Sequence, residues 1–109
     1  MIETLISRVG AANAPLTSGR LSALMGQHGS MTLRWYAPTG TDPQTPHDQD
    51  ELYIVVSGIG LFVRGDERVT FGPHDVLFAR AGEVHRFENF SADFATWVVF
   101  YGAVGGESP

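Results

Sequence analysis

The 109-residue sequence contains no cysteine and no lysine. Without cysteine the chain cannot form disulfides, use a thiolate nucleophile or build a cysteine-rich metal site. Without lysine it cannot form a Schiff base or supply the lysine of a phosphate-binding P-loop. Any chemistry must therefore run through other side chains or through a bound cofactor.

The chain is also low in positive charge and has no long apolar run. Seven basic residues, all of them arginine, stand against twelve acidic ones, and the net charge is −5. This balance opposes non-specific nucleic-acid binding, so we expect no nucleic-acid partner. No stretch approaches the roughly 18 apolar residues of a membrane span. Residues 1–14 lack the apolar run of a signal peptide, so we predict no membrane association and the cytoplasm as the default location.

Apolar alternation, by contrast, runs through most of the chain. Apolar residues make up 43% of the sequence and aromatic residues 11%, as is typical of one globular domain. From residue 20 onward, short runs with a period of two are separated by turns that contain glycine, proline or aspartate. The expected strands are residues 21–26, 31–36, 52–56, 61–64, 69–71, 76–79, 84–87 and 94–101. With no confident helix, this pattern predicts an all-β sandwich or barrel.

Both ends of the chain are less regular than its middle. Residues 2–9 are compatible with one or two helical turns or with an arm strand. We therefore predict an N-terminal arm at residues 1–19, a barrel at residues 20–101 and a flexible tail at residues 102–109.

A first polar motif precedes one of the expected strands and contains His47 and Glu51. On a straight strand these two residues would lie about 13 Å apart, too far to share an ion. The polar residues 48–50 favour a bend, which would bring the two side chains together. After the bend, Glu51, Tyr53 and Val55 point to one face of the strand.

A second polar motif lies about thirty residues later and contains His85, which shares a strand face with Phe87. If both faces line the inside of a barrel, His85 can meet His47 and Glu51. Two histidines and one carboxylate are a set that binds a divalent transition metal. The alternative is that all three are ordinary polar residues, solvated in a loop or beside a turn.

The spacing within and between the motifs resembles the cupin family, in particular its small single-domain bacterial members. Two spacings carry the resemblance over residues 20–101: His47, three residues, Glu51, six residues, Gly58; and Gly82, two residues, His85, three residues, Asn89. The resemblance implies a jelly-roll barrel, or double-stranded β-helix, with a metal near its centre. It implies His47, Glu51 and His85 as the metal ligands, with Gly58 and Asn89 in structural roles.

The sequence departs from the family pattern at one ligand position. The family's first motif histidine falls on Thr45, which leaves two histidines and one glutamate. This smaller set has open positions and suits non-haem Fe(II), although Mn, Ni or Zn would also fit. It is equally compatible with a weakened site that has lost its metal. Gln44, Thr45 or Gln49 could add a weak oxygen ligand.

Two functions follow as hypotheses. The first is a small-molecule metalloenzyme, with a dioxygenase-type oxidoreductase favoured over an isomerase and with Glu51 and Tyr53 as catalytic candidates. The second is a non-catalytic binding or sensor module with a weakened or absent metal site. Because barrels of this kind expose edge strands, we also expect a homodimer through the N-terminal segment or an edge strand.

Overall fold

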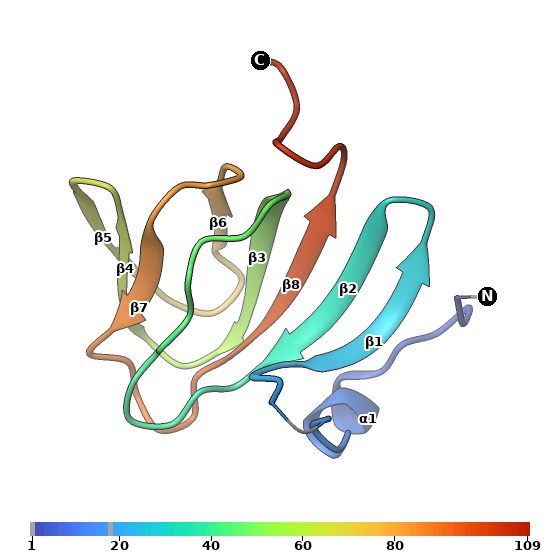
Figure 1. Ribbon diagram of the computed structural model, residues 1–109. Coiled ribbons are helices and arrows are strands. Elements are labelled where there is room, and N and C mark those ends of the chain that lie inside the picture. The colour runs from blue at the N-terminus through green and yellow to red at the C-terminus, as the bar shows by residue number, and fades with distance from the viewer. Residues whose placement is uncertain (1, 18) are drawn as a thin grey trace.

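The computed structural model describes residues 2–17 and 19–109, and within them one short helix precedes eight strands (Figure 1). The elements are α1 Arg8–Ala12, β1 Ala23–His28, β2 Met31–Tyr36, β3 Asp50–Ser57, β4 Gly60–Arg64, β5 Glu67–Phe71, β6 Val76–Ala79, β7 His85–Glu88 and β8 Ala95–Tyr101. Each expected strand is present, with ends that move by about two residues at most. The all-β prediction is confirmed.

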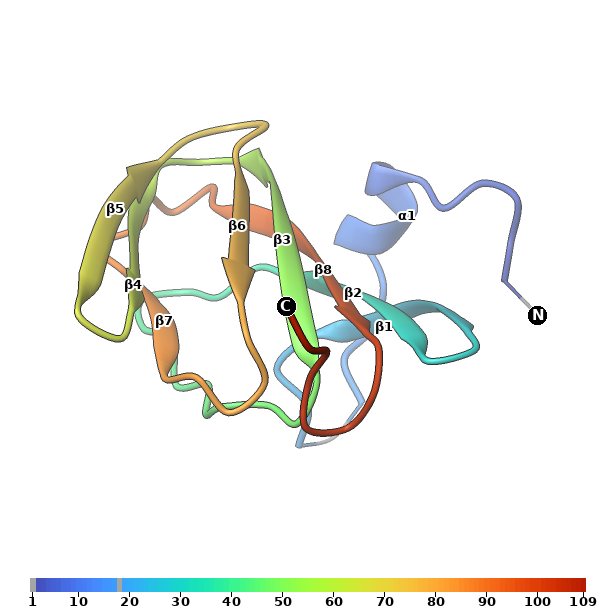
Figure 2. The same ribbon diagram turned by 90° about the horizontal axis from the view of Figure 1, so that it is seen from above.

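The strands form two antiparallel sheets that face each other as a jelly-roll barrel (Figure 2). One sheet has the order β1-β2-β8-β3-β6 and the other has the order β5-β4-β7. Strands β3 and β8 are far apart in sequence but pair along almost their whole length. Because each sheet turns one face toward the other, every strand can send alternate side chains into the space between them.

The core between the sheets is largely aromatic. Tyr53 and Phe87 come from opposite sheets, and their rings meet edge to face with centroids 4.9 Å apart. Val55, Phe62 and Phe94 pack into the same cluster. Burial of such a side chain contributes about 1.5–3 kcal/mol each, so this cluster is a main source of the stability of the barrel.

A second cluster lies on the outer face of the larger sheet. Ala11 of α1 packs there with Ala23, Trp35 and Ala95. The N-terminal segment follows the same surface, and the end carbons of Ile2 and Ile6 lie 3.0 Å from where a Cβ atom would stand on Gly26. The segment therefore packs on strand β1 of its own chain, and a larger residue at Gly26 would require these isoleucine side chains to shift.

Over most of residues 2–9 the structure shows neither of the two expected conformations: residues 2–7 are irregular, and the short helix covers Arg8–Ala12. The expected arm at residues 1–19 includes Met1 and Ser18, which lie outside the described residues. The division into arm, barrel and tail stays a prediction. No helix among the described residues is long and apolar enough to cross a membrane.

The C-terminal segment, residues 102–109, is hydrogen-bonded to the rest of the chain. The Gly102 amide donates to Ser30 Oγ at 3.1 Å, the Gly105 amide donates to the Asp48 carbonyl at 2.7 Å, and the Glu107 amide donates to Asp50 Oδ2 at 2.9 Å. Two of these contacts reach the residues that lead into β3. The flexibility expected for this segment stays a prediction, but its contacts place it against the candidate site.

Candidate metal centre

Three side chains meet at one end of the barrel. His47 lies in the loop before β3, Glu51 is the second residue of β3, and His85 is the first residue of β7 in the opposite sheet. One ligand atom from each lies within 4.8 Å of the others. The structure thus brings together the three residues that the sequence suggested as ligands, with one of them on the second sheet.

The bend that joins His47 to Glu51 is present and is held from several sides. The chain bends at residues 48–49, immediately before β3 begins at Asp50. The Gly82 amide donates to the His47 carbonyl at 2.7 Å. The Asp50 carboxylate accepts from the Ala81 amide at 2.9 Å as well as from the tail. These backbone hydrogen bonds also lower the pKa of Asp50, which stays ionised as an anchor.

Strand alternation then directs Glu51 inward, as predicted. Glu51, Tyr53 and Val55 are 0%, 1% and 1% exposed, and they share the inner face of β3. On β7, His85 and Phe87 are likewise buried on one face. A glutamate carboxylate without solvent needs compensation from its neighbours, because an isolated buried charge is costly.

His85 is oriented by a hydrogen bond on the side away from Glu51. Its Nδ1 atom lies 2.7 Å from the Glu83 carbonyl oxygen, and a carbonyl only accepts, so Nδ1 carries a proton. In the neutral ring the lone pair is then on Nε2. That atom contacts Glu51 Oε1 and lies 3.1 Å from the Tyr53 hydroxyl oxygen. The ring therefore presents the atom that a metal would bind.

The second oxygen of Glu51 faces His47. Nδ1 of His47 and Oε2 of Glu51 are 3.2 Å apart, which is within ion-pair range. The pair nevertheless lacks hydrogen-bond geometry, and both atoms are buried without a hydrogen-bond partner. Buried polar atoms without a partner are costly, about 1–3 kcal/mol each. A cation between them would satisfy both, so the donor set fits a divalent transition metal.

The ionisation of the centre follows from the same contacts. Burial raises the pKa of Glu51, but its contacts with His47 and His85 outweigh burial and leave that pKa below its usual range. Burial lowers the pKa of His85, but Glu51 outweighs burial and leaves that pKa raised. In the metal-free protein, a proton on His85 therefore takes the place of a cation beside Glu51.

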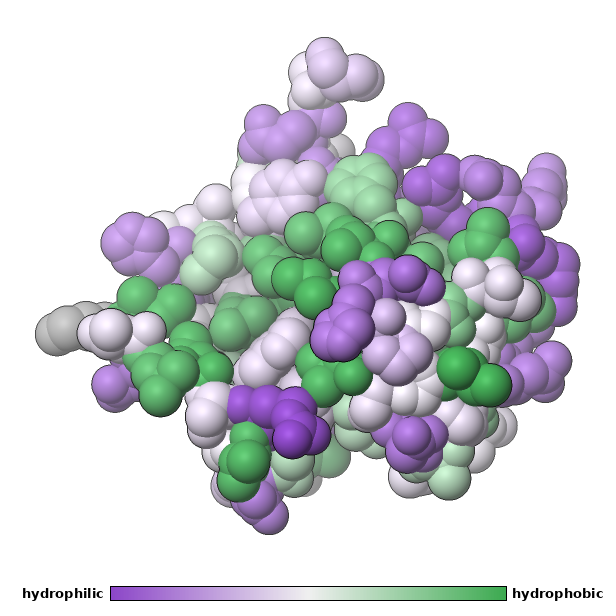
Figure 3. Space-filling view, turned by 180° about the vertical axis from the view of Figure 1, so that it is seen from behind, coloured by the Kyte–Doolittle hydropathy of each residue, from purple (hydrophilic) through white to green (hydrophobic). Residues whose placement is uncertain are grey.

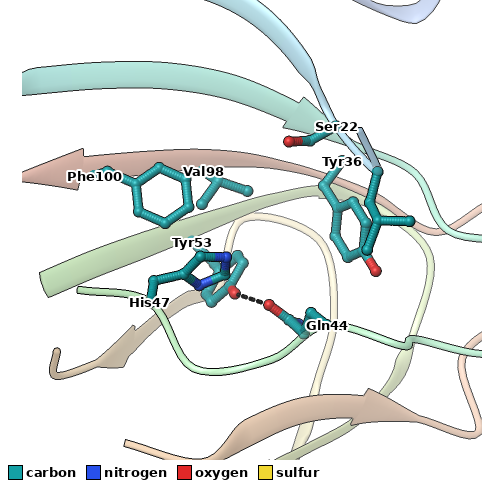
Figure 4. Close-up of a pocket in the computed structure, with 8 residues that line it drawn as sticks. Ser22, Tyr36, Gln44, His47, Tyr53, Val98 and Phe100 are labelled. Carbon is teal, nitrogen blue, oxygen red and sulfur yellow. Dashed lines mark hydrogen bonds between the residues drawn. The ribbon is translucent and has the colours of Figure 1, made fainter. Parts of the chain in front are cut away.

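Tyr53 joins the centre to the loop that covers it. Burial, followed by the charge of Glu51, raises the pKa of Tyr53 well above its ordinary value, so the phenol keeps its proton. Its hydroxyl lies 3.0 Å from Gln44 Oε1 and 3.1 Å from Glu51 Oε1, and it can donate to one of them at a time (Figure 4). Gln44 is held in turn by Asp42. Tyr53 is thus a donor and not a base.

A small pocket opens beside these residues. It contains about 300 Å³ of space, some of it open to solvent, at the low end of the range for ligand sites. Figure 4 shows His47, Tyr53 and Gln44 on one side of the pocket and Ser22 and Tyr36 on the other. The remaining lining residues are apolar: Leu21, Val98 and Phe100.

The other candidates from the sequence lie outside this pocket. Thr45 lines an adjoining outer recess together with Gln44 and His47. The two remaining histidines of the chain, His28 and His74, were not candidates and are exposed. Gln49 donates to the carbonyl oxygens of Ser30 and Gly102 at the tail.

Sequence reasoning did not identify the far wall of the pocket. Ser22 precedes β1, and Phe100 lies on β8, whose register against β3 is not visible in the sequence. The Phe100 ring packs edge-on against His47 with centroids 4.9 Å apart. The alternation of β8 was the one signal that could have placed Phe100 inside.

The comparisons with known proteins agree with this architecture. A family model described as a cupin domain matches residues 33–101. The chain therefore belongs to the cupin family. An uncharacterised protein of Streptomyces coelicolor is 42% identical over 60 residues, which are 55% of this chain and 57% of that protein. The match thus spans little more than half of the relative's length.

Solved structures show the same fold. A cupin 2 conserved barrel domain protein from Salinispora arenicola has a TM-score of 0.69 and 20% identity, covering 93% of this chain and 91% of that one. KdgF from Halomonas sp. has a TM-score of 0.65 and 14% identity over 73% and 77%. A chain from the structures of the DMSP lyases RdDddP and RnDddQII has a TM-score of 0.56 and 28% identity over 68% and 38%.

The paired shifts at Glu51 and His85 predict a pH-dependent stability. Stability from Glu51 is present above its unfolded pKa of 4.5 and is lost as the pH falls through its lowered folded value. Stability from His85 is present below its unfolded pKa of 6.5 and is lost as the pH rises through its raised folded value. Metal-free protein should therefore be most stable between the two unfolded pKa values, 4.5 and 6.5, where both contributions are present. Its melting temperature should decline as the pH rises from there toward 8.

The stabilisation that added Zn(II) provides should have the opposite dependence on pH. A metal displaces the proton of His85, so its affinity should rise about tenfold per pH unit while that proton is present. Stabilisation by Zn(II) should thus be greater at pH 8 than at pH 5.5. His85→Gln is the matched control and should lose both the decline and the Zn(II) effect. A metal-free protein that gains stability from pH 5.5 to pH 8 would contradict the charge assignment.

Proposed function

We propose that this protein is a mononuclear metalloenzyme that acts on a small molecule, with the ion held by His47, Glu51 and His85. The observation that carries the proposal is the pair of buried, unpartnered atoms, His47 Nδ1 and Glu51 Oε2, which face each other at 3.2 Å. Nε2 of His85 contacts the other oxygen of the same carboxylate, and a metal would replace the proton between these two atoms. Imidazole and carboxylate together suit Fe, Mn, Ni or Zn.

Within this centre each residue has a definite task. A bound ion would supply Lewis acidity and, if it were Fe(II), one-electron chemistry with O₂. Glu51 accepts the Tyr53 hydroxyl and contacts both histidines, and so sets the spacing of the donors. Tyr53 could instead turn its hydrogen bond from Glu51 or Gln44 to a group in the pocket. Phe100 covers one side of His47 and limits the access of water.

Of the reactions open to such a centre, we propose an oxidoreductase of dioxygenase type. Support comes from the donor set, since two histidines and one carboxylate with open positions are typical of non-haem Fe(II) oxygenases. An isomerase or lyase would use the same ligands, and a chain 28% identical to this one is from the DMSP lyase structures. The cytoplasmic location stays a prediction.

The second candidate is a non-catalytic cupin that binds a small ligand or acts as a sensor. The observation that favours it is Thr45, which stands at the position of the family's first motif histidine and lines the recess beside His47. A centre with one ligand fewer binds its ion less tightly. The amount of metal that the protein carries, and whether the bound metal has an open position, therefore distinguish this candidate from the metalloenzyme.

Metal content is the first test. Purified protein loaded with Fe(II), Mn(II), Ni(II) or Zn(II) should carry about one ion per chain by elemental analysis. His47→Ala and His85→Ala should each lower the affinity by about tenfold or more, since each removes one of three protein ligands. The exposed His28→Ala and His74→Ala are matched controls and should bind as the wild type does. Protein that takes up none of these metals would overturn the proposal.

Nitric oxide tests whether the loaded centre has an open position. The Fe(II) protein should bind this O₂ analogue and give the EPR signal of a high-spin iron–nitrosyl. Thr45→His adds the missing imidazole, so it should raise Fe(II) affinity and weaken nitrosyl formation. A metal-replete wild-type protein without a nitrosyl signal would contradict the dioxygenase reading and favour the non-catalytic module.

The expected homodimer belongs to the same proposal. Apolar side chains gather on the side of the N-terminal segment (Figure 3), and Leu5 and Val9 of that segment are 78% and 66% exposed. Edge strand β1 lies beside them and has a partner on one side only within the described sheet. Light scattering should give twice the 11.8 kDa of one chain, and Leu5→Glu should lower that mass. A monomeric wild type would show the expectation to be wrong.

A further inference from the structure

One arginine faces the inside of the barrel. Arg34 lies on β2, where it shares a face with Tyr36 and stands opposite Val98 of β8. Both of these neighbours line the pocket at the metal centre. Arg34 is 8% exposed, so most of the residue is shielded from solvent. A long cationic side chain in this position is unusual, because such residues are rarely buried without a partner.

The polar contacts of Arg34 leave its charge uncompensated. Its Nε atom donates to Ser22 Oγ at 2.6 Å, and its Nη2 atom donates to the Ser22 carbonyl at 2.8 Å. Both acceptors are neutral. Among the described residues, the arginines that form ion pairs with carboxylates are Arg64, Arg68, Arg80 and Arg86. Arg34 is thus a largely buried cation, and no carboxylate in the described part of the chain forms an ion pair with it.

A second positive charge adds to the first. Burial, followed by the charge of Arg20, lowers the pKa of Arg34, so two guanidinium groups lie near each other. Arg20 lines the outer recess that also contains Ser22 and His47. The chain as a whole carries a net charge of −5, so two arginines on one side of the pocket are a local departure from its overall charge.

Ser22 contacts Arg34 and also lines the pocket beside the metal centre. It accepts both hydrogen bonds from Arg34, and it lines the pocket on the side opposite His47 and Tyr53 (Figure 4). The guanidinium therefore lies within hydrogen-bond distance of one wall of the pocket, and the donor set lies at the opposite wall. The lining between these two walls is apolar, supplied by Val98 and Phe100.

We propose that the pocket binds a small carboxylate, with the carboxylate group held at Arg34 and Ser22 and the remainder directed toward the metal centre. The inference deepens the proposed function by assigning a substrate class to the same site, and it rests on that function. A planar carboxylate matches the edge of a guanidinium. A phosphate would call for more donors than one guanidinium with two hydrogens already used on Ser22.

The test uses Zn(II)-loaded full-length protein, with propionate and succinate as probes and propionamide and succinamide as their uncharged counterparts. Isothermal titration should detect the carboxylates and not the amides. Arg34→Met should weaken carboxylate binding by about tenfold or more, as expected for loss of a charge-assisted hydrogen bond. Added salt should weaken binding to the wild type and have little effect on that variant. Arg68→Met removes an exposed, paired arginine of β5 and is the matched control.

The outcomes separate this inference from the metal centre. Protein that takes up no Zn(II) contradicts the proposed function itself. Protein with one Zn(II) per chain that binds no carboxylate, or binds the amides as well, overturns the carboxylate assignment alone. If Arg34→Met binds the carboxylates as tightly as the wild type does, the metal alone holds them. If inorganic phosphate competes with equal affinity, the site binds anions in general. Both results overturn the inference.

If Arg34→Met does not fold, two milder variants test the carboxylate assignment. Arg20 is exposed, so Arg20→Met should fold normally and weaken carboxylate binding by a few fold through loss of its charge. Ser22→Ala should also weaken binding, because it removes the hydroxyl that fixes the guanidinium. Circular dichroism and Zn(II) content serve as checks on the fold. Unchanged affinity in both variants would overturn the inference.

Discussion

The carboxylate of Glu51 is the group on which the rest of the site depends. It is fully buried, and its two oxygens meet a histidine each, one from a loop and one from the opposite sheet. A carboxylate in this position is tolerated because positive charge is at hand, either a proton on His85 or a cation between the donors. The surrounding contacts hold the partners of this one group at the required distance.

The loop, the tail and the sheets contribute to that geometry in different ways. Asp50 ties the start of β3 to the turn at Ala81 and to the tail at Glu107, and these bonds maintain the bend that presents His47. Asp42 and Gln44 fix the loop above Tyr53. The aromatic rings of the core pack against one another beneath the site, and polar contacts of the loop cover it from above.

The sequence was sufficient to predict the positions of residues where the pattern is local and periodic. Alternation along β3 placed Glu51 and Tyr53 on one face, and the two motif spacings brought His85 to the same end of the barrel. It was insufficient where pairing is long-range. The inward position of Arg34 depends on its register with Val98, and the contact between Glu107 and Asp50 joins residues that lie far apart in sequence. A short polar tail carries no periodic signal that could predict such a contact.

The distribution of the donors over both sheets has a mechanical consequence. His47 and Glu51 belong to the side of the barrel formed by the five-stranded sheet, whereas His85 begins a strand of the three-stranded sheet. An ion held by all three would add a link between the sheets to the hydrogen bond from Arg64 of β4 to the Phe78 carbonyl of β6. Removal of the ion would then weaken the joint between the two sheets as well as the chemistry of the site.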